Sequence, residues 1–314
     1  MKKSIKILLV GTGAVGSYYG GRLAQAGAEV SVVCRSDFQI VKEQGIYLNS
    51  VAGNFHFKPK EVLKRVSDYQ DQPDYILVAT KVLPEIKVVD LIKEKVCKKT
   101  SIVLLQNGIN IEADIEIAFP NNQIISGLAF ICATRAKFGQ VDHQDYGRIT
   151  VGKYPLGISN EVNILADYFR KASVDCNLDE DIIKARWIKL VWNAPFNPIS
   201  VLGGGVDTKA ILASEATFNV VKKVMKEVYI LAEKDGHSFS YDIIAKNISD
   251  TLKMTPYKTS MLIDYESRRP MEVEAILGNA LKLGKKYAVS IPYLESLYGL
   301  LKLIDKANLE GAGR

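Results

Sequence analysis

The sequence predicts an α/β fold in the first part of the chain and an all-α region after it. Up to about residue 180, short apolar runs alternate with helical patterns, which is typical of a parallel sheet covered by helices. Beyond that point helical patterns continue and no strong strand signal remains. A chain of 314 residues is also long for a single hydrophobic core. We therefore expect two domains, formed by residues 1–180 and 181–314.

The first elements form a strand–helix–strand pattern. Ile5–Val10 is a short apolar run that predicts a buried strand, and Ala14–Ala26 is a helical pattern that ends at Gly27. Glu29–Cys34 predicts the second strand. This order is that of a compact βαβ unit.

Further strands and two hairpins are expected before residue 180. The strands are predicted at Tyr75–Thr80, Ile102–Gln106 and Ile124–Ile131. Gly45–Phe57 alternates around Ala52-Gly53-Asn54 and predicts a hairpin. Val141–Gly152 predicts a second hairpin, with Gly147 near its turn.

The rest of the chain favours helices throughout. They are predicted at Asp181–Trp192, Lys209–Asp235, Tyr241–Lys253, Pro270–Tyr287 and Ile291–Ala307.

Composition excludes several classes of function. A net charge of +6 is spread along the chain without a dense basic arm, so nucleic acid is not an expected partner. No apolar stretch approaches membrane-spanning length, so we expect no membrane partner. Four isolated cysteines and three scattered histidines have no metal-ligand spacing. These features predict a reduced cytoplasmic enzyme that binds no metal.

A glycine-rich segment lies between the first strand and the first helix. It has the spacing G-x-G-x-x-G, in which the first glycine permits a tight turn and the second lets the backbone approach a pyrophosphate. The third allows close packing of helix on strand, and the helix N-terminus offers N–H groups to the phosphates. A glycine turn without a ligand is the alternative, but the strand and helix around it favour a Rossmann dinucleotide-binding domain. The cofactor-binding candidates here are Gly11, Thr12, Gly13, Ala14, Val15 and Gly16.

The end of the second strand indicates which dinucleotide binds. A site for NAD usually has an acidic residue about 20 positions beyond the fingerprint, where it accepts from the ribose hydroxyl. Arg35 occupies that position, and its guanidinium suits a 2′-phosphate. Asp37 falls beyond the strand end. We therefore predict that the domain binds NADP(H) through Arg35. The alternative is that Arg35 is only a solvated charge in a loop.

A polar stripe marks the start of the helical half. Lys189, Asn193 and Asn197 are four residues apart and lie on one side of a helix. A core face would not contain a lysine and two asparagines, and a solvated face would not place Trp187 and Trp192 so near. The stripe predicts a lined cleft, and an ordinary surface stripe is the alternative.

Three motifs far apart in the sequence resemble those of the ketopantoate (2-dehydropantoate) reductases. They are Leu105-Gln106-Asn107-Gly108, the W-x-K-L-x-x-N-x-x-x-N-P block of Trp187–Pro198, and Ser260 followed twelve residues later by Glu272. Together with the fingerprint, the resemblance covers most of the chain. It implies NADPH-dependent reduction of ketopantoate to pantoate, on the way to pantothenate and coenzyme A.

The resemblance also implies the roles of the residues in these motifs. Lys189 would be the general acid that gives a proton to the substrate carbonyl as hydride arrives. Asn107 would lie beside the nicotinamide and orient Lys189, and Glu272 would contact the ribose or a substrate hydroxyl. Lys81 would approach the adenosine phosphate, and Ala133 would supply a backbone contact near the nicotinamide. The residues that would bind the 2-oxo acid are Lys189, Asn193, Asn197 and Ser260.

Some alternatives stay open. Pro195 lies within the polar stripe and is expected to kink or end the helix there. A related NADP-dependent reductase of another small 2-oxo acid shares the fingerprint. A non-catalytic NADPH sensor would keep the glycines but has no reason to combine Lys189, Asn193 and Glu272. A homodimer is compatible with the resemblance.

Overall fold

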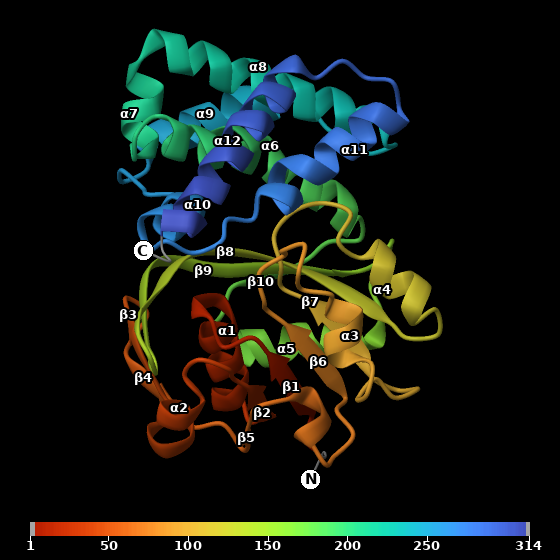
Figure 1. The fold of residues 1–314 in the computed structure, drawn as a ribbon. Coiled ribbons are helices and arrows are strands. Elements are labelled where there is room, and N and C mark those ends of the chain that lie inside the picture. The colour runs from red at the N-terminus through yellow and green to blue at the C-terminus, as the bar shows by residue number, and fades with distance from the viewer. Residues whose placement is uncertain (1–3, 312–314) are drawn as a thin grey trace. The chain divides into compact units, whose positions relative to one another are not determined.

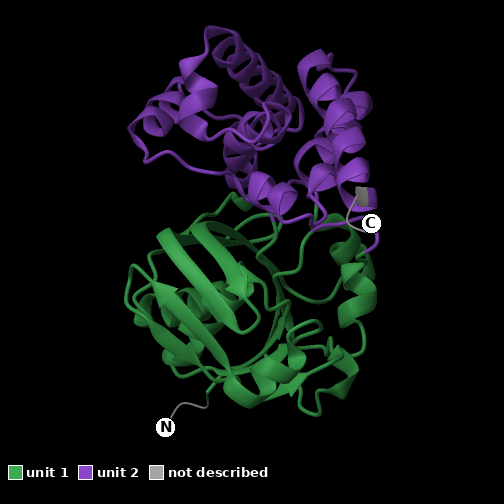
Figure 2. Ribbon diagram, turned by 60° about the vertical axis from the view of Figure 1, so that its left-hand side comes forward, with its two compact units in different colours: residues 1–81, 86–106, 111–182 green, residues 82–85, 107–110, 183–314 purple. Residues whose placement is uncertain are grey.

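The computed structural model describes residues 4–311 and confirms an α/β region followed by an all-α region (Figure 1). By backbone contacts these residues form two compact units (Figure 2). Unit 1 contains residues 4–81, 86–106 and 111–182, and unit 2 contains residues 82–85, 107–110 and 183–311. The expected boundary at residue 180 stays a prediction, because two short loops from the first half of the chain belong by contact to unit 2.

Unit 1 is built on one sheet with the order β4-β3-β9-β8-β7-β6-β1-β2-β5, in which β10 pairs with β9. The strands are β1 (Lys6–Val10), β2 (Glu29–Val33), β3 (Ile46–Ser50), β4 (Phe55–Phe57), β5 (Val62–Leu63), β6 (Tyr75–Val78), β7 (Ser101–Leu104), β8 (Ile124–Lys137), β9 (Gln140–Lys153) and β10 (Cys176–Leu178). The helices are α1 (Ala14–Gln25), α2 (Phe38–Gln44), α3 (Val88–Ile92), α4 (Ala113–Ala118) and α5 (Asn160–Lys171), with a 3₁₀ turn at Val66–Asp68. The strands from β8 to β5 along this order are parallel neighbours.

Both faces of the parallel strands are buried, which explains why they read as continuous apolar runs. Successive side chains of β1 enter different cores: Ile7 and Leu9 pack with α1 and α5. Leu8 and Val10 pack with α3 and α4 on the other face. At its carboxyl end, this buried strand leads directly into the glycine turn at the N-terminus of α1.

The first predicted hairpin is confirmed, and the second is wrong. β3 and β4 pair antiparallel on either side of the turn at Gly53. Val141–Gly152 instead lies within one long strand, β9, which pairs antiparallel with β8. Tyr146 and Gly147 have φ values of 60° and 110°, and the register with β8 shifts there. Gly147 therefore marks a β-bulge rather than a turn.

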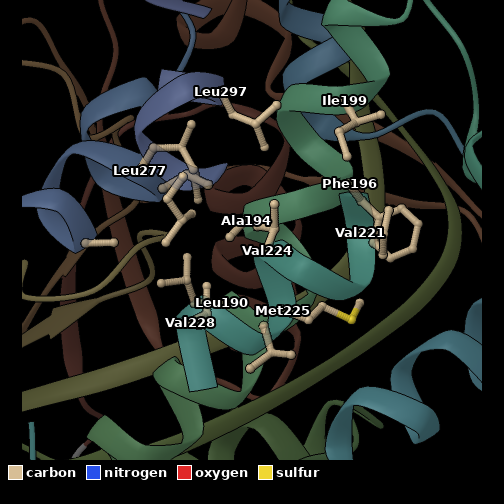
Figure 3. Close-up of a cluster of buried hydrophobic side chains, with 14 of the residues drawn as sticks. Leu190, Ala194, Phe196, Ile199, Val221, Val224, Met225, Val228, Leu277 and Leu297 are labelled. Carbon is tan, nitrogen blue, oxygen red and sulfur yellow. The ribbon is translucent and has the colours of Figure 1, made fainter. Parts of the chain in front are cut away.

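Unit 2 contains helices and, within residues 183–311, no strands. The helices are α6 (Ile182–Leu202), α7 (Thr208–Ala213), α8 (Glu215–Lys234), α9 (Ile243–Lys253), α10 (Ser260–Glu266), a π-helical turn (Glu274–Gly278), α11 (Asn279–Lys286) and α12 (Pro292–Gly311). The single helix expected over Lys209–Asp235 is divided at Ser214, whose backbone is extended. Figure 3 shows α6 side chains Leu190 and Ala194 beside Val228 and Val224 of α8 in the core.

The helix that carries the polar stripe does not end at Pro195. Pro195 was expected to kink or end the helix. α6 continues through Pro195 and Pro198 to Leu202, so the helix does not end there, and a kink stays a prediction. Each proline removes one helical hydrogen bond. Ala194, Phe196 and Ile199 are buried in the core of unit 2, and this packing holds the helix together across the missing bonds.

Among residues 4–311, no helix combines the length and the apolar character needed to cross a bilayer.

Candidate active site

The glycine turn of unit 1 has the geometry that its spacing predicts. Gly11 has a φ of 105°, and a Cβ there would lie 2.8 Å from the Thr80 backbone nitrogen. A Cβ on Gly16 would lie 2.0 Å from the Gly11 carbonyl oxygen and 3.0 Å from Ala79 Cβ. The turn therefore requires glycine at both positions for its own packing.

The middle glycine differs, because nothing in the protein requires it. A Cβ on Gly13 would meet no atom within 4 Å, and its φ is an ordinary −68°. Gly13 is the N-cap of α1 and has no side chain to cap the first N–H groups of the helix. An open approach to uncapped N–H groups is what a pyrophosphate needs, so this turn fits a dinucleotide.

Charged side chains gather just after β2. Arg35 is exposed, whereas Asp37 is only 4% exposed and accepts a hydrogen bond from the Thr12 hydroxyl at 3.5 Å. Arg135 Nη1 lies 3.9 Å from Asp37 Oδ2 and donates to the Ser36 hydroxyl at 3.4 Å. Two guanidinium groups therefore flank this loop, and one of them partners the buried carboxylate.

No sequence motif indicates Arg135 as a site residue. It lies 98 positions after Asp37, and the predicted strand ended at Ile131, whereas β8 continues to Lys137. The extra length of β8 carries Arg135 to the loop. Of the two other residues expected near the cofactor, Lys81 follows the end of β6 and Ala133 lies in β8 opposite His143. Both are partly buried.

Three of the predicted residues form one hydrogen-bonded chain within unit 2. Lys189 Nζ donates to Asn107 Oδ1 at 2.9 Å. Asn107 Nδ2 donates to Glu272 Oε2 at 3.4 Å, and the other oxygen of that carboxylate accepts from the Val82 backbone at 2.9 Å. The loops of residues 82–85 and 107–110 thus join α6 and the segment before the π-helical turn.

The environment of Lys189 changes its acidity. Burial lowers the pKa of its ammonium group, the positive charge of Arg186 lowers the pKa further, and the Glu272 carboxylate raises it. The result is a pKa of about 7, compared with 10.5 for a free lysine side chain. A lysine with this pKa can donate a proton near neutral pH.

The remaining residues of the stripe lie along α6. Asn193 and Asn197 are 8% and 4% exposed, so the stripe is buried rather than solvated. Ser260 is exposed and is the first residue of α10. The Ser200 hydroxyl donates to the Asn197 carbonyl and shares a 2.6 Å hydrogen bond with Thr259, the N-cap of α10.

This tether connects Ser260 to the end of the asparagine stripe. Ser200 and Thr259 were not predicted as positioning residues. Their contact depends on the packing of α10 against α6, which their sequence separation does not reveal.

A metal site within the described part of the chain and a nucleophilic role for Cys34 both lack support. No group of three or more His, Cys, Asp or Glu residues there could hold a metal ion. Cys34 accepts a hydrogen bond from Thr12 at 3.3 Å, but burial raises the pKa of its thiol to about 11. A thiol that stays protonated is a poor nucleophile.

Comparison with known proteins identifies the group to which these features belong. Residues 7–155 match the family described as ketopantoate reductase PanE/ApbA, and residues 181–305 match its C-terminal counterpart. A 2-dehydropantoate 2-reductase of Nostoc sp. is 35% identical over 316 residues, which cover 98% of this chain and 97% of that protein.

Solved structures are similar over the same extent. A 2-dehydropantoate 2-reductase from Methylococcus capsulatus is 46% identical with a TM-score of 0.91, and the match covers 97% of this chain and 98% of that one. A D-mandelate dehydrogenase, solved with NADH and anilino(oxo)acetate, is 26% identical with a TM-score of 0.85 and coverages of 97% and 99%.

Proposed function

The chain belongs to the ketopantoate reductase family, and we propose that it reduces 2-dehydropantoate to pantoate with NADPH. This reaction would supply pantoate for pantothenate and coenzyme A synthesis. The observation that carries the proposal is the partly buried Lys189, held 2.9 Å from the Asn107 carboxamide with a pKa of about 7. An amine of this acidity, in a chain that also contains the glycine turn, suits the reduction of a carbonyl group.

Lys189 acts as the general acid in this proposal. NADPH, when bound, would supply a hydride to the carbonyl carbon. Lys189 would give a proton from Nζ to the carbonyl oxygen. The C=O bond becomes a C–O–H group, and Lys189 is left as a neutral amine. Asn107 accepts one Nζ hydrogen and so fixes the direction of the remaining ones.

The substrate is held by polar groups of unit 2. Asn193 and Asn197 can donate to a carboxylate from a buried face, where such hydrogen bonds are strong. Ser260, anchored through Thr259 and Ser200, can bind a hydroxyl group of the substrate. 2-Dehydropantoate has both groups.

NADPH is favoured over NADH by the charges that follow β2. Arg35 is available to a 2′-phosphate, and Arg135 offsets the negative charge of Asp37 nearby. We expect Arg35→Asp to weaken binding of NADPH far more than binding of NADH, measured by fluorescence titration. Equal effects on the two cofactors would contradict NADP specificity.

An NADH-dependent reductase of a bulkier 2-oxo acid is the second candidate. The similar D-mandelate dehydrogenase was solved with NADH and an anilino-substituted oxo acid. In this chain Trp192, next to Asn193, stacks on Phe196 at 4.8 Å and lies 6.5 Å from Tyr257. Trp192 and Tyr257 are partly buried, whereas Phe196 is fully buried. Contact of the first two with an aromatic substituent would favour this alternative.

Turnover with a panel of 2-oxo acids separates the candidates. NADPH or NADH absorbance is followed with 2-dehydropantoate, pyruvate, 2-oxoisovalerate and benzoylformate. We expect the highest kcat/KM with NADPH and 2-dehydropantoate. Activity confined to benzoylformate would overturn the substrate assignment. Absence of turnover with every acid would overturn the assignment of the chain as a 2-oxo acid reductase.

The acid itself is tested by substitution. Lys189→Arg keeps the charge but cannot release a proton near neutral pH, so it should lose at least about a hundredfold in kcat. Lys223→Arg, at an exposed position of α8, is the matched control and should be fully active. Near-normal turnover by Lys189→Arg would remove Lys189 as the acid.

The same proposal assigns a ligand to each domain and an oligomeric state to the protein. Residues 1–180 would bind NADP(H), and residues 181–314 would bind the substrate. We propose a cytoplasmic enzyme that forms a homodimer, which sedimentation at several protein concentrations tests.

A further inference from the structure

The short loop of residues 107–110 is held by two side chains of unit 2. Arg186 Nη1 donates to the Gly108 carbonyl at 3.1 Å, and Asn279 Nδ2 donates to the Ile109 carbonyl at 2.9 Å. One comes from α6, which also carries Lys189, and the other begins α11. The loop that presents Asn107 is therefore fixed through its backbone on two sides.

Gly108 lets this loop approach the π-helical turn closely. It has a φ of 98°, and a Cβ there would lie 2.5 Å from the Ala275 carbonyl oxygen. A π-helical turn is uncommon and is often found at functional sites. Here it begins two residues after Glu272, which accepts from Asn107. The peptide between Asn107 and Ile109 has little space in which to move.

Arg186 is an unusual residue for this position. Its side chain is only 2% exposed, and burying a guanidinium group is costly unless hydrogen bonds or an opposite charge compensate the lost solvation. It precedes Lys189 by three residues on α6, so the two side chains lie on adjacent positions of the helix surface. Arg186 lies outside the motifs that predict the other site residues.

We propose that Arg186 is a positioning residue for the reduction. It holds the Gly108 carbonyl, so that the Asn107 carboxamide stays in place to accept the hydrogen bond from the Lys189 ammonium group. This inference rests on the proposed function. Lys189 reaches Asn107, Asn107 is bonded in the chain to Gly108, and Gly108 is held by Arg186 on the same helix as Lys189. Helix α6 therefore carries the acid, Lys189, and through Arg186 also holds the loop that carries its hydrogen-bond acceptor, Asn107.

The charge of Arg186 has a second consequence for the proton transfer. Before transfer Lys189 carries a positive charge beside another cation, and afterwards it is a neutral amine. Arg186 therefore favours the state that follows donation, and Glu272 on the other side favours the state before it. These two charged residues face Lys189 from α6 and from the segment before the π-helical turn.

Steady-state kinetics from pH 6 to pH 10 test the proposal. Arg186→Met removes both the hydrogen bond and the charge, Arg186→Lys keeps the charge, and Asn279→Ala removes a backbone anchor of the same loop without a charge. We expect Arg186→Met to lower kcat about tenfold or more and to move the alkaline limb of kcat/KM upward by about one pH unit. Its affinity for NADPH, measured by fluorescence titration, should be unchanged.

The other two variants separate positioning from general stability. Arg186→Lys should restore the position of the alkaline limb. Asn279→Ala should lower kcat while the limb stays where it is in the natural protein. If Arg186→Met does not fold, Arg186→Gln, which keeps a polar head group, should show the same shift of the limb.

Three outcomes would overturn the proposal. An unshifted limb with normal kcat would mean that Arg186 is not coupled to Lys189. A higher KM with unchanged kcat would make it a substrate ligand. Identical effects of Arg186→Met and Asn279→Ala on kcat and on the limb would make both merely structural. Inactivity of the natural protein toward every 2-oxo acid would instead defeat the proposed function, so the two failures can be distinguished.

Discussion

Lys189 is the residue on which the proposed chemistry depends, and its acidity sets the pH dependence of the reaction. A general acid must be protonated, so activity requires a pH below its pKa. With a pKa of about 7, kcat/KM should be constant below pH 7 and fall about tenfold per pH unit above it. Steady-state kinetics at saturating NADPH measure this limb.

The limb of kcat should lie at higher pH than that of kcat/KM. An anionic 2-oxo acid bound beside the ammonium favours its charged form and raises its pKa. A kcat/KM that rises through pH 7–9 would contradict Lys189 as the proton donor.

The same pKa predicts how Lys189 affects stability. Below pH 7 the ammonium is charged in both states, and the folded state bears the full cost of burying it. Between pH 7 and 10.5 the unfolded state holds more protons, so the free energy of unfolding rises with pH. Lys189→Met removes this dependence, so the cofactor-free variant should be more stable than the natural protein at pH 6, by a few kcal/mol at most.

Urea unfolding at pH 6 and pH 9 measures the effect. The advantage of Lys189→Met should shrink at pH 9, and contributions that do not depend on pH, such as the lost bond to Asn107, cancel in the comparison. Lys223→Met, at an exposed position of α8, should show no such change. An advantage equal at both pH values would mean that burial does not lower the pKa of Lys189.

At the scale of elements, the turn between β1 and α1 separates glycines that serve folding from one that serves a ligand. Gly16→Ala would place Cβ 2.0 Å from the Gly11 carbonyl oxygen, so we expect it to lose about 1–3 kcal/mol of stability or more. Gly13→Ala meets nothing within 4 Å and should change stability by less than about 1 kcal/mol. It should nevertheless weaken NADPH binding about tenfold or more, because its methyl group occupies the approach to the α1 N–H groups.

Thermal unfolding and fluorescence titration measure the two properties on the same samples. If Gly13→Ala binds NADPH normally, the pyrophosphate does not lie on this turn. If Gly16→Ala is as stable as the natural protein, the turn relaxes more easily than its close contacts indicate.

The elements that could be predicted from sequence are those whose pattern reflects local geometry. The glycine spacing and the buried strands of the βαβ unit are examples, because a tight turn and a two-sided core each constrain a few neighbouring residues. Gly147 was misassigned because a glycine with positive φ suits a bulge as well as a turn, and only the pairing of β8 with β9 decides between them. Pro195 does not end its helix, because core packing of α6 outweighs one lost hydrogen bond.

The candidate site divides in the same way. Lys189, Asn193 and Asn197 could be predicted as one stripe, because they repeat at the period of a helix. Arg135 and Arg186 could not, because each acts on a loop that only the folded chain brings to it. A buried arginine cannot be told from a surface arginine by its neighbours in the sequence.

At the scale of the whole molecule, the two units have separate hydrophobic cores. The cores of unit 1 lie on the two faces of its sheet, and the core of unit 2 surrounds α6. The chain's two tryptophans, Trp187 and Trp192, both lie in α6. Intrinsic tryptophan fluorescence therefore reports the unfolding of unit 2, whereas far-UV circular dichroism reports both units.

This arrangement predicts that a core substitution in one unit can be followed separately from the other. Leu231→Ala in α8 and Ile102→Ala in β7 each truncate a side chain with no exposed surface and should cost about 2–5 kcal/mol in their own unit. Leu231→Ala should lower the urea midpoint of the fluorescence transition. Ile102→Ala should leave that midpoint unchanged and lower the midpoint of an earlier step seen by circular dichroism, because domains with their own cores commonly unfold in separate steps.

Addition of 2′,5′-ADP, which contains only the adenosine part of the cofactor, should raise the midpoint of the step that Ile102→Ala lowers. If Ile102→Ala shifts the fluorescence transition as much as Leu231→Ala does, the loops of residues 82–85 and 107–110 couple the two cores into one cooperative unit.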